Sequence, residues 1–348
     1  MRFGIFQSVQ LPDPKAEVRY YSEALDQVRW AEELGYDSVW LTEHHFSRHG
    51  IVSSTLTVLA YLAGVTSTIR LGSAVTILPF HDPIHVAEEA ATVDLLSEGR
   101  LDFGIGRGFQ WGEYHKLNIP MEDANRRFEE AMDVITKAWT LEVPFEHRGE
   151  FWNYSDMSIH PRPVQSPHPP VWVAASSLAS MHRAARNNWN LMIGQGVNFT
   201  QVAKQVQYYS SAIGEAGFDY TPGRVVVARP MYTAASEDQA RRDTHAPYMW
   251  FKQTGIYPIS HMIVVKDEHL ADNQWLPGEL ISMFQAAKKP YLEQLHSGAN
   301  QSPADKTIMN LSNIVGDDPL PYGIDSSRKA LDTFMQFNFD QKVIQKKV

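Results

Sequence analysis

The chain has 348 residues, of which 43% are hydrophobic and 20% charged, a composition typical of a globular protein with a large core. It contains no cysteine, which excludes disulfides, zinc–thiolate sites, iron–sulfur clusters and a thiol nucleophile. The net charge of −9 argues against nucleic acid or an anionic membrane surface as a partner. No run of 18 apolar residues occurs, and the N-terminal MRFGIFQSVQLPDPK lacks a signal peptide's apolar region, so we expect a cytoplasmic protein.

Short apolar, β-branched runs alternate with amphipathic runs over the first 140 residues. The pattern predicts strands at Arg2–Ser8, Ser38–His44, Arg70–Leu78 and Leu101–Arg107, and helices at Glu17–Leu34, Ser54–Gly64, Pro83–Leu96 and Asp123–Thr140. The four units therefore repeat every ~30–35 residues, a spacing that suits a parallel barrel or a doubly wound sheet.

The pattern is interrupted at Leu141–Pro170, where a hairpin around Glu146–Trp152 precedes a proline-rich run. Beyond it we predict strands at Val171–Ala175, Leu191–Gly194 and Val225–Thr233, and helices at Leu178–Asn187, Thr200–Glu215, from Ser236 and at Ser326–Gln336. Residues 252–322 show a poor pattern and are interpreted as an inserted lid, because loops of this length are usually functional or disordered. An eighth strand would have to come from Lys342–Gln345. No linker is visible, so one domain over residues 1–348 is expected.

The run Glu43-His44-His45-Phe46 lies at the predicted end of the second strand. In parallel α/β folds this end faces the active site. Adjacent side chains of a strand point to opposite faces, so one imidazole can line the opening while the other packs or caps. Polar residues in a solvated loop are the plain alternative. An acid, two histidines and an aromatic residue together favour a functional site.

A metal site is the rival interpretation of the same histidines, because imidazole is a common zinc ligand. Metallohydrolases built on barrels usually take an H-x-H pair from the first strand, and Arg2–Ser8 contains neither histidine nor carboxylate. His81 and His85 could join a cluster, but they stand at the start of the third predicted helix. We therefore expect no metal.

An arginine between two glycines, Arg107, follows the fourth predicted strand in the run GIGRGF. It is not a dinucleotide fingerprint, because Phe109 stands where G-x-G-x-x-G requires glycine. Glycine permits close backbone approach, and arginine offers paired donors for a phosphate or carboxylate. A turn carrying a surface arginine is the alternative.

Small residues mark the ends of two other strands. Ala174-Ala175-Ser176-Ser177 precedes a helix, where it could bind an anion, although ordinary N-capping by Ser176 or Ser177 explains it as well. In the third strand, Gly72-Ser73-Ala74-Val75-Thr76 could let a flat ring lie against the backbone, or could simply pack tightly. The residues do not separate these alternatives.

Taken together, these motifs resemble the bacterial luciferase-like flavin-dependent monooxygenases. The resemblance is carried by LTEHHF at 41–46, LGSAVTILPFHDP at 71–83, EGRLDFGIGRG at 98–108 and VWVAASS at 171–177. It implies a (β/α)8 TIM barrel, an α/β fold, that binds reduced FMN at the strand ends and activates O2 as a flavin C4a-peroxide. It also implies a homodimer and a separate NAD(P)H-dependent flavin reductase as partner.

The resemblance assigns a role to each matching position. It implies catalysis by His44 within the cluster that also contains Glu43 and His45, and phosphate binding by Arg107, Ser176 and the Ser177 amide. Ser73, Ala74 and Val75 would support the isoalloxazine on one side, often through a non-proline cis peptide, and Val173 and Ala174 would lie on the other. Phe6 would line the floor of the pocket. Phe46, Phe109 and Trp250 would contact the substrate.

Other interpretations stay open. On the same fold, the chain could be a deazaflavin-dependent dehydrogenase, although the EHHF form favours FMN. It could also be a non-catalytic flavin-binding partner subunit, which should lack the second-strand histidine. Aromatic residues concentrate near the lid and would suit an apolar or aromatic substrate; they are Tyr248, Trp250, Phe251, Tyr257, Trp275 and Phe284.

Overall fold

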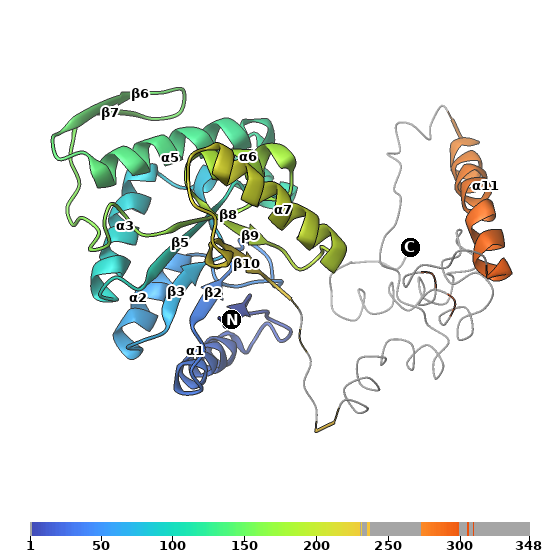
Figure 1. Ribbon diagram of the computed structural model, residues 1–348, viewed down its shortest axis with the longest axis horizontal. Coiled ribbons are helices and arrows are strands. Elements are labelled where there is room, and N and C mark those ends of the chain that lie inside the picture. Colours follow the sequence, from blue (N-terminus) through green and yellow to red (C-terminus); the bar gives the residue numbers. More distant parts are fainter. Residues whose placement is uncertain are drawn as a thin grey trace. The chain divides into compact units, whose positions relative to one another are not determined.

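The computed structural model describes residues 2–229, 231, 235–236, 273–298, 305 and 309. The chain divides into two compact units, Met1–Pro230 and Met231–Val348. The first contains every described strand, and all residues discussed below belong to it unless stated (Figure 1). No described helix is both long and apolar enough to cross a bilayer.

A curled parallel sheet forms the centre of the first unit. Its strands pair in the order of the chain and are β1 (Gly4–Gln7), β2 (Ser38–Leu41), β3 (Arg70–Ser73), β5 (Leu101–Gly106), β8 (Val171–Ala174), β9 (Asn190–Ile193) and β10 (Val225–Val227), while β4 (Thr76–Ile77) also pairs with β5. Sequential parallel strands separated by helices are the arrangement of a TIM barrel. The predicted α/β barrel class is therefore confirmed, and the proposed eighth strand at Lys342–Gln345 lies outside the described residues.

Helices cover the outer face of this sheet (Figure 1). They are α1 (Glu17–Glu33), α2 (Thr55–Val65), α3 (Pro83–Leu96), α4 (Trp111–Lys116), α5 (Ala124–Thr140), α6 (Leu178–Arg186) and α7 (Phe199–Glu215), with short 3-10 turns at Leu78–Phe80, Met121–Asp123 and Pro222–Arg224. Local capping explains several starts: Ser54 accepts the Thr57 N–H at α2, and Asp82 accepts the Ile84 N–H at α3. The short helix α4 was not predicted.

The strands differ from their predicted bounds in ways that matter for the site. β2 ends at Leu41, so Glu43, His44 and His45 belong to the following loop. The predicted strand Arg70–Leu78 is divided into β3 and β4 by a cis peptide bond between Ala74 and Val75. The predicted hairpin is confirmed as β6 (Phe145–Arg148) and β7 (Asn153–Met157).

Side chains pack in two separate layers. The main core lies between sheet and helices and includes Leu71, Phe103 and Val173. A second cluster consists of Trp40, Trp172 and Met192, with the two indoles edge to face at 5.3 Å between centroids. Gly72 and Gly104 leave room for it, because side chains alternate between the faces of a strand. We call this second cluster the barrel interior.

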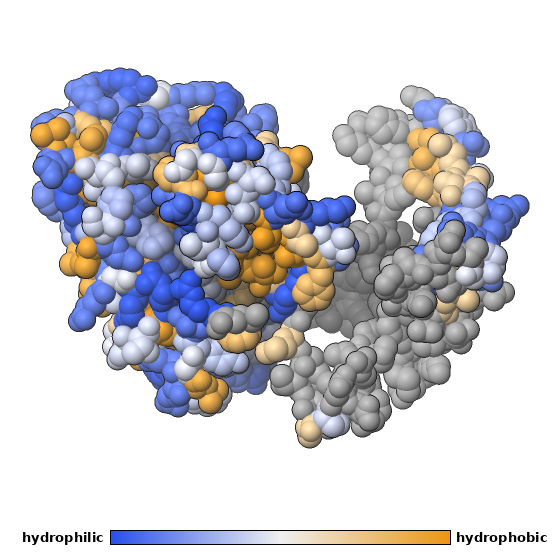
Figure 2. All heavy atoms as spheres, viewed as in Figure 1, coloured by the Kyte–Doolittle hydropathy of each residue, from blue (hydrophilic) through white to orange (hydrophobic). Residues whose placement is uncertain are grey.

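The last described strand, β10, exposes apolar surface. All three of its valines are only half-buried, and Figure 2 shows apolar side chains around its position. In the second unit, α11 (Leu276–Ser297) ends at Gly298 in a left-handed conformation (φ 74°). This helix lies within residues 252–322, for which the sequence pattern predicted no element. The predictions of a lid over this segment and of a single domain stay predictions.

Candidate active site

Loops that follow neighbouring strands meet at the carboxyl edge of the sheet. The loop after β2 carries Glu43, His44 and His45; His81 follows the turn after β4; and α4, after β5, carries Glu113. Each of these residues contacts at least one of the others, although they come from three separate stretches of the chain. The strand order brings them together.

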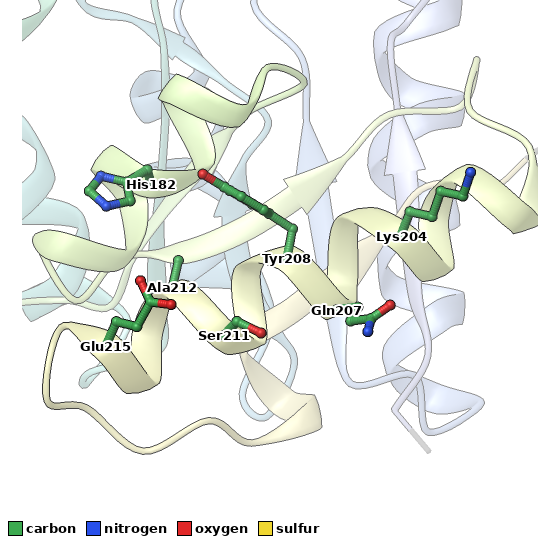
Figure 3. Close-up of a pocket in the computed structure, with 7 residues that line it drawn as sticks. All are labelled: His182, Lys204, Gln207, Tyr208, Ser211, Ala212 and Glu215. Carbon is green, nitrogen blue, oxygen red and sulfur yellow. The ribbon is translucent and has the colours of Figure 1, made fainter.

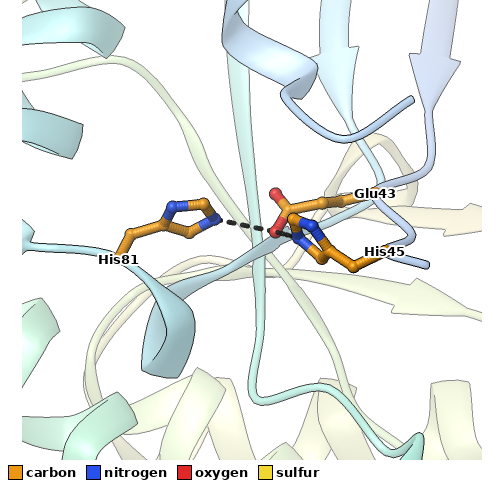
Figure 4. Close-up of side chains that lie close together, drawn as sticks. All are labelled: Glu43, His45 and His81. Carbon is orange, nitrogen blue, oxygen red and sulfur yellow. Dashed lines mark hydrogen bonds and ion pairs between the residues drawn. The ribbon is translucent and has the colours of Figure 1, made fainter. Parts of the chain in front are cut away.

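Glu43 is the buried centre of the first group, which we call the Glu43 triad (Figure 4). Its Oε1 lies 2.7 Å from His81 Nε2 and 3.0 Å from His45 Nε2, while its Oε2 accepts the Ile77 N–H at 3.3 Å. Burial alone would raise the pKa of Glu43, but the hydrogen bonds and charges of the two imidazoles lower it below its usual value. Both carboxylate oxygens are therefore engaged, and the contacts favour an anchoring role for Glu43 and His45.

The same triad is the one described group of three side chains whose ligand atoms lie within 4.8 Å of one another, as a metal site would require. Zinc bonds of about 2.0–2.2 Å at tetrahedral angles would separate the ligand atoms by roughly 3.3–3.5 Å. The observed separation of 2.7 Å between His81 Nε2 and Glu43 Oε1 is that of a charge-assisted hydrogen bond. The geometry therefore favours a hydrogen-bonded triad. His85, the other candidate, is exposed.

The triad makes stability depend on pH. Burial lowers the pKa of His81, but the hydrogen bond and charge of Glu43 outweigh it and raise the pKa above 6.5. The His81 contribution is thus complete below pH 6.5 and disappears as pH rises through the raised value, whereas the Glu43 contribution disappears on acidification below 4.5. We expect His81→Gln to cost about 1 kcal/mol near pH 5.5 and less at pH 9, measured as urea unfolding. An equal cost at both pH values would contradict the ion pair.

His44 belongs to a second group and turns away from the triad. Its Nδ1 lies 3.2 Å from Glu113 Oε1 and 3.1 Å from Gln110 Nε2, and the same Glu113 oxygen accepts the His45 N–H at 2.9 Å. The two adjacent imidazoles therefore have different carboxylate partners. On its other side His44 leaves no space at Gly50, where a Cβ would come within 2.7 Å of His44 Cδ2.

No sequence pattern indicated Glu113 or Gln110, and His81 was named only as a possible member of a metal cluster. The helix α4 has six residues, too few for a helical period to be read. A glutamate in a short segment without a recognisable helical pattern is expected to be solvent-exposed, yet Glu113 is only 3% exposed. Its position shortly after the Arg107 turn was the one available signal.

The predicted phosphate-binding residues share the same edge of the sheet. Ile105 pairs with Val173, so continuation of that register brings Arg107 level with Ala175, next to Ser176. The Arg107 guanidinium makes no hydrogen bond with any described residue, and its carbonyl oxygen accepts the Tyr114 hydroxyl. Burial raises the pKa of Tyr114 to about 12, which keeps this donor protonated.

The two predicted phosphate-binding serines, Ser176 and Ser177, differ in whether their polar groups are already hydrogen-bonded. Ser177 caps α6: its hydroxyl accepts the Ser180 N–H, and its own N–H donates to Ser180 Oγ. The Ser177 amide predicted to bind phosphate is thus already engaged within the described structure. Ser176 is exposed and makes no such contact among the described residues. The capping explanation accounts for Ser177 and leaves Ser176 as the stronger phosphate candidate.

The predicted ring-supporting residues of the third strand lie against the barrel interior. Ala74 and Val75 pack on the cluster of Trp40, Trp172 and Met192 and are half-buried. Ser73 is fully buried and its hydroxyl bonds the Gly104 carbonyl oxygen at 2.7 Å, so its side chain joins β3 to β5. Ala74 and Val75 are therefore the two that present a surface to a ring.

The prediction for Val173 needs correction. Its side chain lies in the core between sheet and helices, because it alternates with Trp172, which points into the barrel interior. Ala174 shares the face of Trp172 and is exposed. Phe6 pairs with Trp40 and therefore faces the interior too, where it is 42% exposed.

Two of the three predicted substrate contacts are described. Phe46 is 57% exposed, in a left-handed backbone conformation (φ 56°), with the Lys116 ammonium 5.5 Å from its ring centroid. Phe109 is 75% exposed. Trp250 lies outside the described residues. Both described aromatic rings are open to a ligand.

A pocket of about 380 Å³ lies elsewhere, between α6 and α7 on the outer surface (Figure 3). Its lining includes His182, Lys204, Tyr208 and Glu215, and none of the predicted site residues. Parallel barrels bind substrates at the carboxyl ends of their strands. The strand ends, and not this outer pocket, are therefore the candidate active site.

Residues 1–306 match the family model of the luciferase-like monooxygenases, so the chain belongs to this family. The oxygenase component of a flavin-dependent trigonelline monooxygenase from Acinetobacter baylyi is 32% identical over 245 residues, covering 69% of this chain and 67% of that protein. The matched part of the chain covers 63% and 67% of the lengths of the first two curated relatives, about two thirds of each.

Solved structures agree on the fold. The monooxygenase RslO1 from Streptomyces bottropensis superposes with a TM-score of 0.67 at 26% identity, covering 95% of this chain and 97% of that one. An F420-dependent secondary alcohol dehydrogenase reaches a TM-score of 0.58 at 19% identity, covering 72% and 74% of the two chains. At 19% identity, the similarity to the dehydrogenase shows a shared fold and nothing about activity.

Proposed function

We propose that this protein is the FMNH2-dependent oxygenase of a two-component monooxygenase that uses O2 to oxidise an organic, apolar or aromatic substrate. The observation that carries the proposal is one juxtaposition at the strand ends. The small, apolar surface of Ala74 and Val75 follows β3, the strand next to β2, and the loop after β2 holds His44. Arg107, whose guanidinium hydrogen-bonds no described residue, follows β5 on the far side of β3, at the same carboxyl edge of the sheet.

These residues fit a flavin. Arg107 and Ser176 would hold the phosphate, since both present polar atoms that no described residue engages. Ala74, Val75 and Ala174 would lie against the ring, and Phe6 would close the floor of the pocket. Reduced flavin supplies the activation of O2, while the protein orients it and excludes water.

His44 is the acid/base that we assign to the reaction. Its Nδ1 is occupied by Glu113, so Nε2 is the ring nitrogen that can give or take a proton at the substrate. The half-buried ring, held against Gly50, cannot move far. Glu43 and His45 would keep this loop in place through the triad. Phe46, Phe109 and Trp250 would contact the substrate.

The proposal is tested by titration with oxidised and reduced flavins. We expect little flavin in the purified protein and tighter binding of FMNH2 than of FMN. Arg107→Ala should weaken FMN by about ten- to a hundredfold, corresponding to a lost charge-assisted contact of roughly 1.5–3 kcal/mol. Riboflavin, which has no phosphate, is the matched ligand and should be weakened far less. Equal loss for both flavins would remove Arg107 from the phosphate site, and stoichiometric FAD would contradict the proposal.

The rivals give different results in the same measurements. A deazaflavin-dependent dehydrogenase would bind F420 in preference to FMNH2 and oxidise an alcohol without consuming O2. A non-catalytic subunit would bind flavin and form no product. A metallohydrolase would contain a stoichiometric metal at the Glu43 triad.

We further propose a cytoplasmic homodimer supplied by a separate NAD(P)H-dependent flavin reductase. The relation to a protein named as an oxygenase component supports the reductase.

A further inference from the structure

The pair formed by His44 and Glu113 is built differently from the Glu43 triad. Glu113 is 3% exposed, and its Oε1 serves two groups, His44 Nδ1 at 3.2 Å and the His45 N–H at 2.9 Å. Its Oε2 is buried with no hydrogen-bond partner among the described residues. A buried carboxylate with one unsatisfied oxygen is costly, which a purely structural anchor such as Glu43 avoids.

The carboxylate restricts the tautomer of His44. An ionised carboxylate has only lone pairs to offer, so its Oε1 can be satisfied by Nδ1–H but is repelled by a bare Nδ1. Gln110 accommodates this state, because a half-turn of its amide presents oxygen instead of nitrogen to the ring. The proton on neutral His44 is therefore placed on Nδ1, and the lone pair on Nε2.

We propose that Glu113 is a positioning residue for the reaction: it holds His44 in the Nδ1–H tautomer and stabilises the imidazolium formed when Nε2 takes a proton. This step rests on the proposed function of His44. One proton moves from the substrate to His44 Nε2 and returns later, and no proton is transferred to Glu113. The positive charge on protonated His44 attracts the neighbouring carboxylate and so offsets part of the energetic cost of its buried, unpartnered Oε2.

The tautomer is measured directly by ¹⁵N NMR of the flavin-free protein, in a buffer alkaline enough for neutral imidazole. The His44 signals are identified by their absence in His44→Gln. We expect wild-type His44 to carry its proton on Nδ1. Glu113→Gln, which keeps the shape and an acceptor for the His45 N–H, should shift the population toward Nε2–H. Glu113→Leu, which removes the acceptor, should shift it further.

Activity supplies the second readout. Glu113→Gln should lower the product yield per FMNH2 by about ten- to a hundredfold, part of the usual contribution of an acid or base. Its FMNH2 affinity should change by less than about twofold. Glu130→Gln is the matched control, since Glu130 also pairs with a histidine, His147, at 3.1 Å, away from the strand ends. This control should lower stability without changing the His44 signals.

Unchanged His44 signals in both Glu113 variants would overturn the proposal, as would a shifted tautomer with full product yield. Because the NMR measurement needs neither flavin nor substrate, it gives the same answer even if the flavin proposal fails. The two proposals can therefore fail separately.

Discussion

Replacement of His44 by alanine is expected to lower product formation by about 10²–10⁴-fold, the usual contribution of a positioned acid or base. The fold and most of the FMNH2 affinity should persist, because His44 is not part of the main core and lies outside the predicted phosphate site. Reduced flavin would then be consumed with release of hydrogen peroxide. The measurement is single-turnover product yield against hydrogen peroxide yield, once a substrate or a surrogate aldehyde is found.

A matched histidine controls for nonspecific effects. His182 is exposed on α6 and lines the outer pocket, so His182→Ala should retain wild-type yield. Normal turnover by the His44→Ala variant would show that the histidine is only part of the rim of the barrel. A loss of flavin affinity equal to the loss of product would instead assign His44 to cofactor binding.

Replacement of Gly104 by alanine is expected to destabilise the barrel by about 3 kcal/mol or more, at the upper end of overpacking effects. An added Cβ would lie 1.7 Å from the Ser73 carbonyl oxygen and 2.8 Å from its carbonyl carbon. These are backbone atoms, so no rotamer change can relieve the clash. β3 and β5 would have to separate, which breaks both hydrogen bonds of the Ser73 hydroxyl with Gly104.

Solubility and urea unfolding measure this effect, and Gly64→Ala is the matched control. Gly64 is exposed in α2 and an added Cβ would meet nothing within 4 Å. Alanine is the better helix former by about 1 kcal/mol, so the control should be neutral or slightly stabilising. A soluble Gly104→Ala variant with an unchanged unfolding midpoint would show that β3 and β5 tolerate separation.

Local sequence patterns were sufficient to predict most helices and strands of the first unit. The predicted helix Pro83–Leu96 has the bounds of α3, because Asp82 caps its start and the required signals, proline at the beginning and glycine after the end, are local. The EHHF run and the GRG turn were likewise predicted at the carboxyl ends of their strands, where the structure has them. By contrast, α4 was missed because six residues are too few to show a helical period. The helix α11 was missed although Pro277 and Gly298 mark its ends, because Pro290 inside it indicates a helix break.

What the sequence determined by itself is therefore the barrel class, the family and the loops that carry the candidate site. The partners of those loops were decided by tertiary structure. Glu113 and His44 are 69 residues apart, and Glu43 and His81 are 38 apart; no sequence spacing relates them. Only the pairing of β2 with β3, and of β3 and β4 with β5, brings their loops together. The pairing of β8 with β5 sets Val173 beside Ile105 on the core face and away from the interior, because a strand can present only alternate side chains to each face.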